Sequence, residues 1–235
     1  MIHIGETDST NRWLMEHGGD DDMVVWADYQ TQGRGCGTNR WESRRGENLL
    51  FSVLMHPLTL EARFQFRISM AVSLAIIDAL TSQLSLPSSQ FAIKWPNDIY
   101  WGDKKLCGIL IENQLTGQHI KRSIIGVGLN VNQVEFVSDA PNPVSLSQIT
   151  GQRHDRNALL AAVIEALPAD PSVVDADRYR SLLYRREGYH PYRDTNGTFE
   201  ARLVDVEDDG HLQLCDRQGH ERRYAFKEVE FIIKH

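Results

Sequence analysis

The sequence predicts a chain that combines α-helices and β-strands in one large domain, with a small β-barrel module after it. Two apolar runs at residues 23–27 and 48–55 are typical of buried strands, and residues 60–84 carry apolar side chains at helical spacing. Towards the C-terminus the chain changes to short segments in which polar and apolar residues alternate. With 235 residues, 41% of them hydrophobic, the chain is long enough to bury a substantial core. We therefore expect domains at residues 1–187 and 188–235.

The N-terminal part is expected to form a short helix, a strand and a long loop. The helix-capping residues Asp8-Ser9-Thr10 precede an apolar triplet, and Gly18-Gly19 follows it as a stop. The apolar run at 23–27 predicts the strand. Residues 30–47 then contain four glycines, four arginines and little apolar periodicity, which indicates a loop. Loops of this length are uncommon in compact domains and are usually functional, so we expect this one to contribute to a site.

The central part is expected to contain the main packing helix and most of the sheet. Apolar residues from Phe64 to Leu80 follow helical spacing and predict a helix that packs against the core. Two strands flank the Gly102-Asp103 turn, and a further pair meets at residues 116–118. A helix capped by Asp155 is expected to end at two prolines, and residues 173–186 resume helical character.

The C-terminal part is expected to be a small β-barrel. Short strands are predicted at residues 198–206, 211–215 and 221–226, because polar and apolar residues alternate there. The turns between them are Asp209-Gly210 and Gln218-Gly219.

Composition argues against several classes of function. Lys and Arg total 25 against 32 for Asp and Glu, so the net charge of −7 does not favour nucleic-acid binding. Cys36, Cys107 and Cys215 are far apart and form no C-x-x-C pair, which argues against disulfides and structural zinc and favours a reducing compartment. The N-terminus lacks the basic residues that begin a signal peptide. No stretch is expected to approach the roughly 18 apolar residues of a membrane span. We therefore expect a cytoplasmic protein without membrane contact.

The segment Lys94-Trp95-Pro96-Asn97-Asp98 holds a cation and a carboxylate four positions apart. Pro96 restricts its own backbone and disfavours helix at the residue before it, while Asn97 and Asp98 favour a turn. One interpretation is an ordinary salt-bridged turn. The other is a rigid support for catalytic groups, which depends on what else lies nearby.

A second candidate is Lys105, seven residues further along. Strand alternation predicts that it shares one face with Cys107, Ile109 and Ile111, and a lysine among apolar neighbours requires an anionic partner. Gly108 indicates a close approach by a ligand or by backbone. The alternative is a lysine whose stem lies on apolar surface while its ammonium reaches solvent. If the two lysines and the aspartate converge, an acyl phosphate is a suitable ligand.

Two glycine-rich segments are candidates for contacts with an anion or a nucleotide. Residues 32–41 combine flexible backbone, exposed amides and the cations of Arg34 and Arg40, although an unstructured surface loop is the alternative. They match neither the Walker loop nor the dinucleotide-binding fingerprint. Gly126-x-Gly128-x-Asn130 follows a strand without opening a helix, so its glycines are expected to admit an adenine or a ribose.

Together these segments resemble the ordered motifs of the biotin protein ligases, over nearly the whole chain. The matching segments are Asp8-Ser9-Thr10-Asn11, Gln30 with Gly33-Arg34-Gly35 and Trp41, Lys94-Trp95-Pro96-Asn97-Asp98, Lys105-Leu106-Cys107-Gly108-Ile109-Leu110-Ile111-Glu112 and Gly126-Val127-Gly128-Leu129-Asn130. The combination of K-W-P-N-D with the K-L-x-G-I-L strand is highly specific. The resemblance implies an α+β fold, in which a mixed-sheet catalytic domain precedes a small SH3-like β-barrel.

The same resemblance implies an ATP-dependent ligase. Such an enzyme forms biotinyl-5'-adenylate from biotin and ATP and transfers biotin to a specific lysine of a biotin carboxyl carrier protein. Mg²⁺ is implied as the companion of ATP, held largely by phosphate oxygens and water rather than by protein ligands. The implied partners are therefore a carrier domain, biotin and ATP, and the resemblance is compatible with a homodimer.

The resemblance also implies roles for individual residues. Those implied in catalysis are Lys105, Asp98, Lys94 and Arg34, with Lys105 beside the reacting carboxylate and α-phosphate and Asp98 orienting the acceptor amine. Those implied in biotin binding are Ser9, Thr10, Asn11, Gln30, Gly33, Arg34, Gly35, Cys36, Trp41, Lys105 and Gly108. Those implied in ATP or adenylate binding are Arg34, Arg40, Trp41, Lys94, Asn97, Lys105, Gly128 and Asn130.

The chain departs from the family pattern in two places. The usual loop continues G-R-G-R-x-G, whereas here Cys36, Gly37 and Thr38 follow, so a cation that helps to hold the adenylate is missing. Bifunctional members carry an N-terminal helix-turn-helix that represses transcription, whereas here the Ser-Thr-Asn motif begins at residue 9. The expectation is a monofunctional ligase without an N-terminal DNA-binding domain.

Two alternatives remain open at this point. A lipoate-type ligase uses the same chemistry with a different acyl pocket, but the W-P-N-D and G-R-G segments are of the biotin type. A non-catalytic interaction protein would use the C-terminal barrel as a binding module, but that barrel shows no pattern of an aromatic stacking surface.

Overall fold

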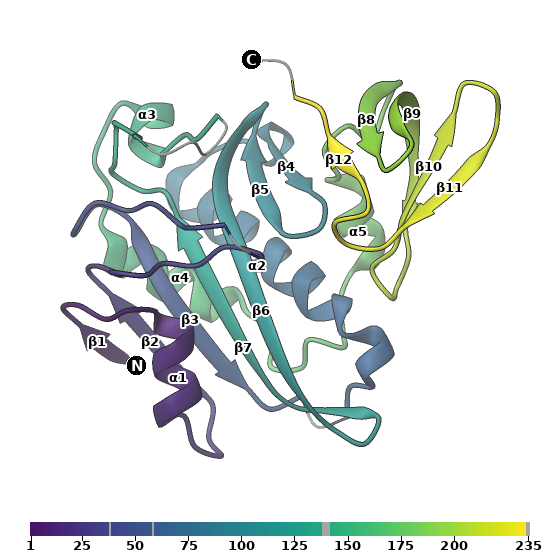
Figure 1. The fold of residues 1–235 in the computed structure, drawn as a ribbon. Helices are drawn as coiled ribbons and strands as arrows, with labels where there is room; N and C mark the ends of the chain where they lie inside the picture. The colour runs from purple at the N-terminus through teal and green to yellow at the C-terminus, as the bar shows by residue number, and fades with distance from the viewer. Residues whose placement is uncertain (38, 58, 138–141, 234–235) are drawn as a thin grey trace.

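The computed structural model describes residues 1–37, 39–57, 59–137 and 142–233. Figure 1 shows two β-sheets: a larger one with helices packed on it, and a smaller one formed by the C-terminal residues. The predicted α+β architecture is confirmed.

The larger sheet has the strand order β1-β2-β3-β7-β6-β5-β4. Its strands are β1 (Ile2–Ile4), β2 (Met23–Ala27), β3 (Leu49–Met55), β4 (Phe91–Lys94), β5 (Asp98–Trp101), β6 (Lys104–Thr116) and β7 (His119–Leu129). β1 runs parallel to β2, whereas every other neighbouring pair is antiparallel. The sheet is therefore mixed, as predicted.

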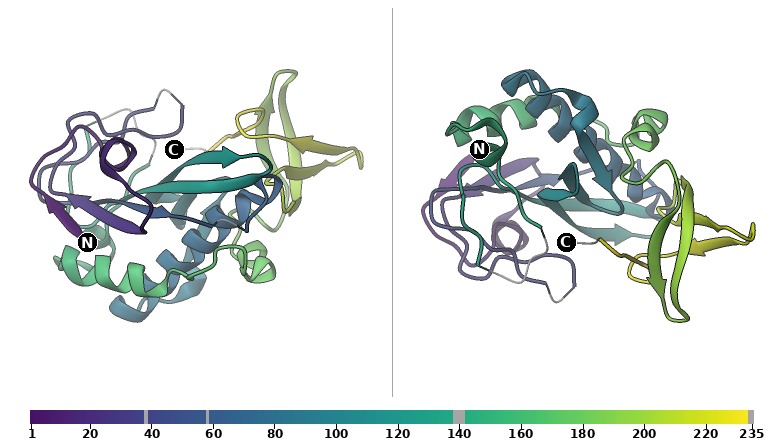
Figure 2. Two further views of the ribbon diagram at one scale, coloured as in Figure 1. Left: turned by 90° about the horizontal axis from the view of Figure 1, so that it is seen from below. Right: turned by 90° about the horizontal axis from the view of Figure 1, so that it is seen from above.

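Different helices cover the two faces of this sheet (Figure 2). On one face lies α1 (Thr10–His17), where Leu14 packs with Leu54 of β3. On the other face lie α2 (Phe66–Leu84) and α4 (Arg156–Ala166), which belong to the main core. Because β3 is covered on both faces, all seven of its residues are buried, which explains why its sequence is a nearly continuous apolar run.

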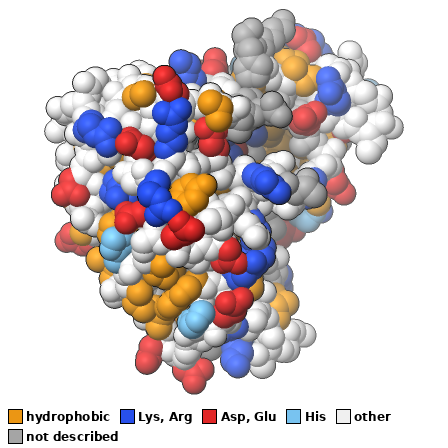
Figure 3. All heavy atoms as spheres, turned by 60° about the vertical axis from the view of Figure 1, so that its left-hand side comes forward, with side chains coloured by type: hydrophobic (Ala, Val, Ile, Leu, Met, Phe, Trp, Pro, Cys, Tyr) orange, Lys and Arg blue, Asp and Glu red, His pale blue; other side chains and the backbone are white. Residues whose placement is uncertain are grey.

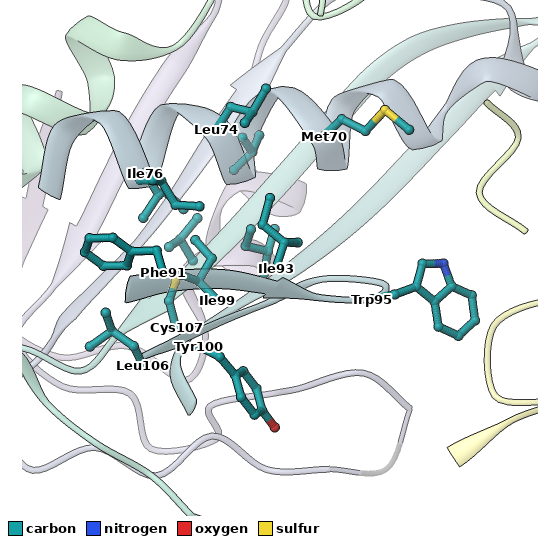
Figure 4. Close-up of a cluster of buried hydrophobic side chains, with 14 of the residues drawn as sticks. Met70, Leu74, Ile76, Phe91, Ile93, Trp95, Ile99, Tyr100, Leu106 and Cys107 are labelled. Carbon is teal, nitrogen blue, oxygen red and sulfur yellow. The ribbon is translucent and has the colours of Figure 1, made fainter. Parts of the chain in front are cut away.

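The main core lies between α2 and the β4–β6 part of the sheet. Figure 4 shows Met70, Leu74 and Ile76 on α2, which lies over the strand residues Phe91 and Ile93, with Ile76 nearest to Phe91. All five side chains are buried. The predicted packing helix is confirmed, although it begins at residue 66 after a short 3-10 turn, η1 (Ala62–Phe64).

This helix also corrects one expectation about membranes. The segment Ala62–Leu84 has a mean hydropathy of 1.4 and is long and apolar enough to cross a membrane by length and composition. However, 67% of its 18-residue window is buried inside the protein, as in the core helix of a soluble protein. Its apolar character is explained by contact with the sheet.

Around the larger sheet, two strands and one α-helix were not predicted: β1, β4 and α3 (Leu146–Thr150). They are too short for a hydrophobic period to be recognised. The helix expected at residues 173–186 is shorter than predicted and comprises only α5 (Ala176–Ser181). It ends because the next residues pair with Ile93 on the edge strand β4: Ile93 N–H donates to the Leu182 carbonyl at 2.7 Å.

The smaller sheet has the order β11-β10-β9-β8-β12, and all its pairs are antiparallel. Its strands are β8 (His190–Asp194), β9 (Gly197–Val206), β10 (Leu212–Asp216), β11 (Glu221–Tyr224) and β12 (Glu230–Phe231). The three predicted strands are confirmed, whereas β8 and β12 were missed. Among the described residues no pairing joins β11 to β12, so the expected barrel is an open sheet, consistent with an SH3-like module. The domain boundary after residue 187 stays a prediction.

The smaller sheet is fixed to the larger one through specific contacts. Trp95, in the β4–β5 turn, donates its indole N–H to the Gly210 carbonyl at 2.9 Å. Arg67 of α2 pairs with Asp208 at 2.9 Å. Gly210 has φ +91, and a Cβ there would lie 2.8 Å from the Phe66 ring, so glycine permits both the turn and the close approach.

Figure 3 shows a face of the molecule on which basic and acidic side chains are interspersed. No continuous basic surface of the kind that attracts a nucleic-acid backbone is visible on this face.

Candidate active site

A cavity of about 1280 Å³ brings the predicted site residues together. It is lined by the start of α1, the loop at residues 30–47, the β4–β5 hairpin, strands β6 and β7, and part of the C-terminal module. The predicted residues that line it are Ser9, Thr10, Asn11, Gln30, Arg34, Gly35, Cys36, Arg40, Trp41, Lys94, Asn97, Asp98, Lys105, Gly108, Gly128 and Asn130. Gly33 does not line it, but its carbonyl accepts the Trp41 N–H at 3.0 Å and so positions a residue that does.

One part of the cavity wall carries hydroxyl and amide groups. Thr10 N–H donates to Gln30 Oε1 at 2.8 Å, and Thr10 Oγ1 lies 3.0 Å from the same oxygen. Ser9 caps α1 by accepting the Arg12 N–H at its hydroxyl. Ser9, Thr10 and the adjacent Asn11 are buried. This set of donors and acceptors suits a neutral cyclic urea.

Ser52 of β3 belongs to the same polar group and was not predicted. Its Oγ lies 2.7 Å from Thr10 Oγ1 and 2.6 Å from Asn11 Oδ1, and the residue is buried. One hydroxyl has one proton, so Ser52 donates to only one of these oxygens at a time. The sequence did contain a recognisable feature, because Ser52 is the only hydroxyl residue in an otherwise apolar strand.

Asn11 is held from two further sides. Its Nδ2 donates to Glu112 Oε2 of β6 at 2.7 Å. Beneath it lies Gly126 of β7, where a Cβ would overlap the Asn11 amide. Gly126 was expected to leave space for a nucleotide, whereas the structure places the Asn11 side chain there.

The Trp41 side chain lies against two other glycines, in the space that a Cβ atom would need there. A Cβ on Gly128 would overlap its indole ring, and a Cβ on Gly108 would lie 2.9 Å from it. Lys105 Nζ lies 5.6 Å from the centre of the Trp41 ring, within reach of a cation–π contact. The indole N–H is buried without a partner among the described residues. The close approach predicted at Gly108 is therefore made by a tryptophan side chain.

Lys105 and Asp98 form an ion pair, with Nζ and Oδ1 2.7 Å apart. Only 26% of the lysine side chain and 15% of the aspartate side chain are exposed, so solvent screens the pair less than a surface pair. The two residues come from neighbouring strands, β6 and β5. A partly buried, paired cation is thereby held where it can face a second anion.

A β-bulge corrects the predicted orientation of Lys105. Tyr100 of β5 pairs with Lys105, but the preceding Ile99 pairs with Cys107, so Leu106 is an extra residue in β6. Leu106 and Cys107 are both buried in the core. Lys105 therefore lies on the opposite side from Cys107, Ile109 and Ile111. It faces the side of Gly108, where a Cβ would lie 3.4 Å from Lys105 Nζ.

Lys94 lies directly across the hairpin from Asp98 in register. Burial in the cavity wall lowers the pKa of its ammonium, and the negative charge of Asp98 opposes that shift. Lys94 Nζ lies 4.9 Å from the ring centre of Phe231 and 5.8 Å from that of Tyr100. A cation with so little hydration gains more from an anionic ligand than an exposed one.

The two predicted asparagines hold backbone in place. Asn97 Nδ2 donates to the Ile109 carbonyl, and Asn130 Nδ2 donates to the Val144 carbonyl at 3.1 Å. Asn97 follows the cis Trp95–Pro96 bond in the hairpin turn. Both amides line the cavity while supporting its wall.

Arg34 points to a carboxylate in this structure. Its Nη2 lies 2.9 Å from Glu112 Oε2, so Glu112 binds both the loop arginine and Asn11. Glu112 was part of the recognised motif but had no predicted role. Arg40 lies at the exposed rim of the cavity and pairs with Arg34 through a backbone bridge.

Cys36 replaces the second arginine expected in the loop. Its Sγ accepts a hydrogen bond from Asn97 Nδ2 at 2.9 Å. Burial raises the pKa of the thiol, and the nearby charges of Asp98, Lys105 and Lys227 partly cancel one another. Cys36 is therefore a neutral thiol at pH 7.

We expect Cys36 to react slowly with iodoacetamide at pH 8, because the thiolate is the reactive form and the raised pKa keeps it scarce. Mass spectrometry should show slower labelling than for free cysteine in the same tube. Cys107 and Cys215 serve as internal references, because both are buried. Labelling of Cys36 at the rate of free cysteine would contradict the raised pKa.

The C-terminal module contributes an entire wall that sequence reasoning did not assign. Residues 226–233 line the cavity, together with residues 193–195. Phe226 packs edge-on against Trp95, with ring centres 6.3 Å apart. No local motif identifies these residues, because their position depends on how the two sheets pack.

Among the residues that the structure describes, one group of side chains of the types that bind metals lies outside the cavity. Glu207, Asp209 and His211 have ligand atoms within 4.8 Å of one another. The Arg223 guanidinium binds both carboxylates, at 2.7 Å each, so both acidic groups already have a cationic partner. The group is consequently a salt-bridge cluster of the small sheet rather than a candidate cofactor site.

Comparison with known proteins places this chain in a family. Residues 6–130 match the model of the Biotin/lipoate A/B protein ligase family. The chain is 29% identical to the bifunctional ligase/repressor BirA of Bacillus subtilis, over 94% of this chain and 70% of that protein. It is 31% identical to the biotin–[acetyl-CoA-carboxylase] ligase of Mycobacterium tuberculosis, over 71% of this chain and 62% of the relative.

The fold agrees with these sequence matches. The structure of the biotin protein ligase from Aquifex aeolicus in complex with biotin and ATP superimposes with a TM-score of 0.80. The match has 24% identity and covers 99% of both chains. The chain thus belongs to the Biotin/lipoate A/B protein ligase family, and its predicted likeness to the biotin protein ligases, as enzymes that form an amide bond, is confirmed.

Proposed function

We propose that this protein forms biotinyl-5'-adenylate from biotin and ATP and transfers biotin to a lysine of a biotin carboxyl carrier protein domain. The observation that carries the proposal is the Lys105–Asp98 pair, 2.7 Å apart in the same cavity as the polar group around Thr10 and Asn11. One region suits the ureido ring, and the other suits the carboxylate and phosphate that react.

In the first step a biotin carboxylate oxygen attacks the α-phosphorus of ATP. A new P–O bond forms, the bond to the β-phosphate oxygen breaks, and pyrophosphate leaves with the electron pair. Negative charge builds up on the α-phosphate oxygens, where Lys105 and Lys94 provide fixed cations. No nucleophilic side chain is needed, because the substrate carboxylate is the nucleophile.

In the second step the carrier lysine attacks the acyl carbon of the mixed anhydride. A C–N bond forms, the C–O bond to the phosphate breaks, AMP leaves, and the amine loses a proton to solvent. Asp98 accepts a hydrogen bond from the incoming amine and favours its approach. Only the neutral amine is nucleophilic, and a site that excludes water favours that form.

Mg²⁺ fits this site as the companion of ATP. Asp98, the carboxylate nearest to the proposed reacting groups, is a poor metal ligand because it is already paired with Lys105. Phosphate oxygens and water would then provide most of the Mg²⁺ ligands, which is the usual arrangement for nucleotide-bound magnesium.

Two assays test the proposal in order. Biotin-dependent exchange of labelled pyrophosphate into ATP tests the first step, and transfer of labelled biotin to a purified carrier domain tests the second. Competition with lipoate distinguishes the lipoate-type alternative. Exchange supported by lipoate but not by biotin would contradict the proposal.

We expect biotin with ATP to protect the loop at residues 30–47 from trypsin. Some of the contacts that hold the loop are ion pairs, such as Arg45 with Glu6 and Arg44 with Glu135, which are exposed and therefore weak. A bound adenylate adds a phosphate that the loop arginines can contact.

Cleavage after Arg34, Arg40, Arg44 and Arg45, followed by mass spectrometry, measures this protection. ATP alone is the control, because the adenylate requires biotin. Equal cleavage with and without biotin plus ATP would show that the loop does not close over the ligand.

A further inference from the structure

Two cations of the cavity are already paired with carboxylates at short distance. Lys105 binds Asp98 at 2.7 Å, and Arg34 binds Glu112 at 2.9 Å. Each can contact a phosphate only while sharing its charge with that carboxylate. A phosphodiester in the cavity therefore gains less from these two residues than their formal charges imply.

Lys227 differs from them in having no such partner. It lies in the segment between β11 and β12 and lines the same cavity. Within the described part of the chain, no carboxylate lies within 4.0 Å of its ammonium. Its side chain is exposed.

The ammonium of Lys227 lies over the loop. A Cβ on Gly37 would overlap it, so the lysine of the C-terminal module contacts the loop backbone. Glycine at position 37 has φ +72 and leaves the space that this contact needs. The neighbouring thiol of Cys36 is close enough to both Lys227 and Lys105 for each charge to act on it. Lys227 therefore reaches the loop next to Cys36 from the C-terminal module, whereas Lys105 belongs to β6 of the larger sheet.

The backbone of Lys227 is also unusual. Its φ of +71 lies in the left-handed region that residues with a side chain rarely adopt. Such a conformation persists when the surrounding structure imposes it, and functional sites are one place where it is found.

We propose that Lys227 binds the phosphate of the adenylate and supplies, from the C-terminal module, the positive charge that the loop lacks at Cys36. This inference rests on the proposed function, because the phosphate in question is that of biotinyl-5'-adenylate. It also assigns a role to the C-terminal module: the module completes the adenylate site in addition to enclosing it.

Titration calorimetry with two ligands tests this role. Biotinol-5'-AMP is a stable phosphodiester analogue of the adenylate, and biotin alone lacks the phosphate. We expect Lys227→Gln to weaken binding of the analogue by about twofold to fivefold, as for a single charge contact near the surface, and to leave biotin binding unchanged. The difference should shrink at high salt.

Three further variants sharpen the test. Lys227→Arg keeps the charge and should bind the analogue like the wild type. Lys121→Gln removes an exposed lysine of β7 outside the cavity and should have no effect. Cys36→Arg, combined with Lys227→Gln, should restore the lost affinity, because an arginine at position 36 brings a cation to the same place.

The outcomes are distinguishable. Equal affinity of the analogue for the wild type and Lys227→Gln overturns the assignment of Lys227. An equal loss for biotin and the analogue also overturns it, because the lysine would then support the fold rather than the phosphate. Failure of the wild type to bind biotin at all would overturn the proposed function itself.

Discussion

Replacing Lys105 with alanine is expected to abolish most adenylate formation while the protein remains folded. Lys105 faces the position of the reacting carboxylate and α-phosphate, where charge develops in the transition state. Removal of one such electrostatic contact lowers turnover by about 10²–10³-fold in comparable sites. The effect should appear in kcat more than in biotin affinity, since the contact is made mainly in the transition state.

Pyrophosphate exchange and biotin binding, measured on the same preparations, check this prediction. Lys104→Ala is the matched control, because Lys104 is the adjacent exposed lysine and does not line the cavity. In the variant the Asp98 carboxylate loses its ion-pair partner, which can destabilise the fold. A thermal melting curve therefore checks that the variant is still folded. Normal exchange by a folded Lys105→Ala protein would remove Lys105 from the mechanism.

Replacing Gly126 with valine is expected to reduce biotin affinity by more than about tenfold, because the new side chain forces Asn11 out of its position. Asn11 cannot move freely, since Ser52 and Glu112 hold its amide from two sides. Overpacking of this kind also lowers the free energy of unfolding, by about 1–3 kcal/mol. Calorimetry with biotin and a denaturant melt measure the two effects.

Gly19→Ala provides the reference substitution. A Cβ at Gly19 meets no atom within 4 Å, so biotin binding should stay normal. If Gly126→Val binds biotin as tightly as the wild type does, Asn11 is not part of the ureido site.

Most of the local elements could be predicted because they depend on neighbours in sequence. Strand β2 was predicted with its observed bounds, and α1 was expected from the caps before its apolar residues. The candidate site was also largely predictable, because the motif residues carry the chemistry themselves. All but Gly33 of the predicted residues line one cavity.

The orientation of Lys105 could not be predicted in this way. Strand alternation assumes an uninterrupted strand, and a bulge at Leu106 reverses the alternation there. Nothing in the local sequence marks Leu106 as the extra residue, because its place depends on pairing with β5. The same limit applies to Ser52, whose role depends on α1 lying across β3.

The sequence by itself determined which residue types are available and where the short-range elements begin, because capping, alternation and helical spacing act over a few residues. Only the tertiary structure decided which group each cation contacts. Arg34 pairs with Glu112, Lys105 pairs with Asp98, and Lys227 contacts the loop at Gly37. The first and last of these contacts join residues that are 78 and 190 positions apart. Such contacts form only when whole elements pack, because the cost of closing a long chain segment is met by burial of the core rather than by any local preference.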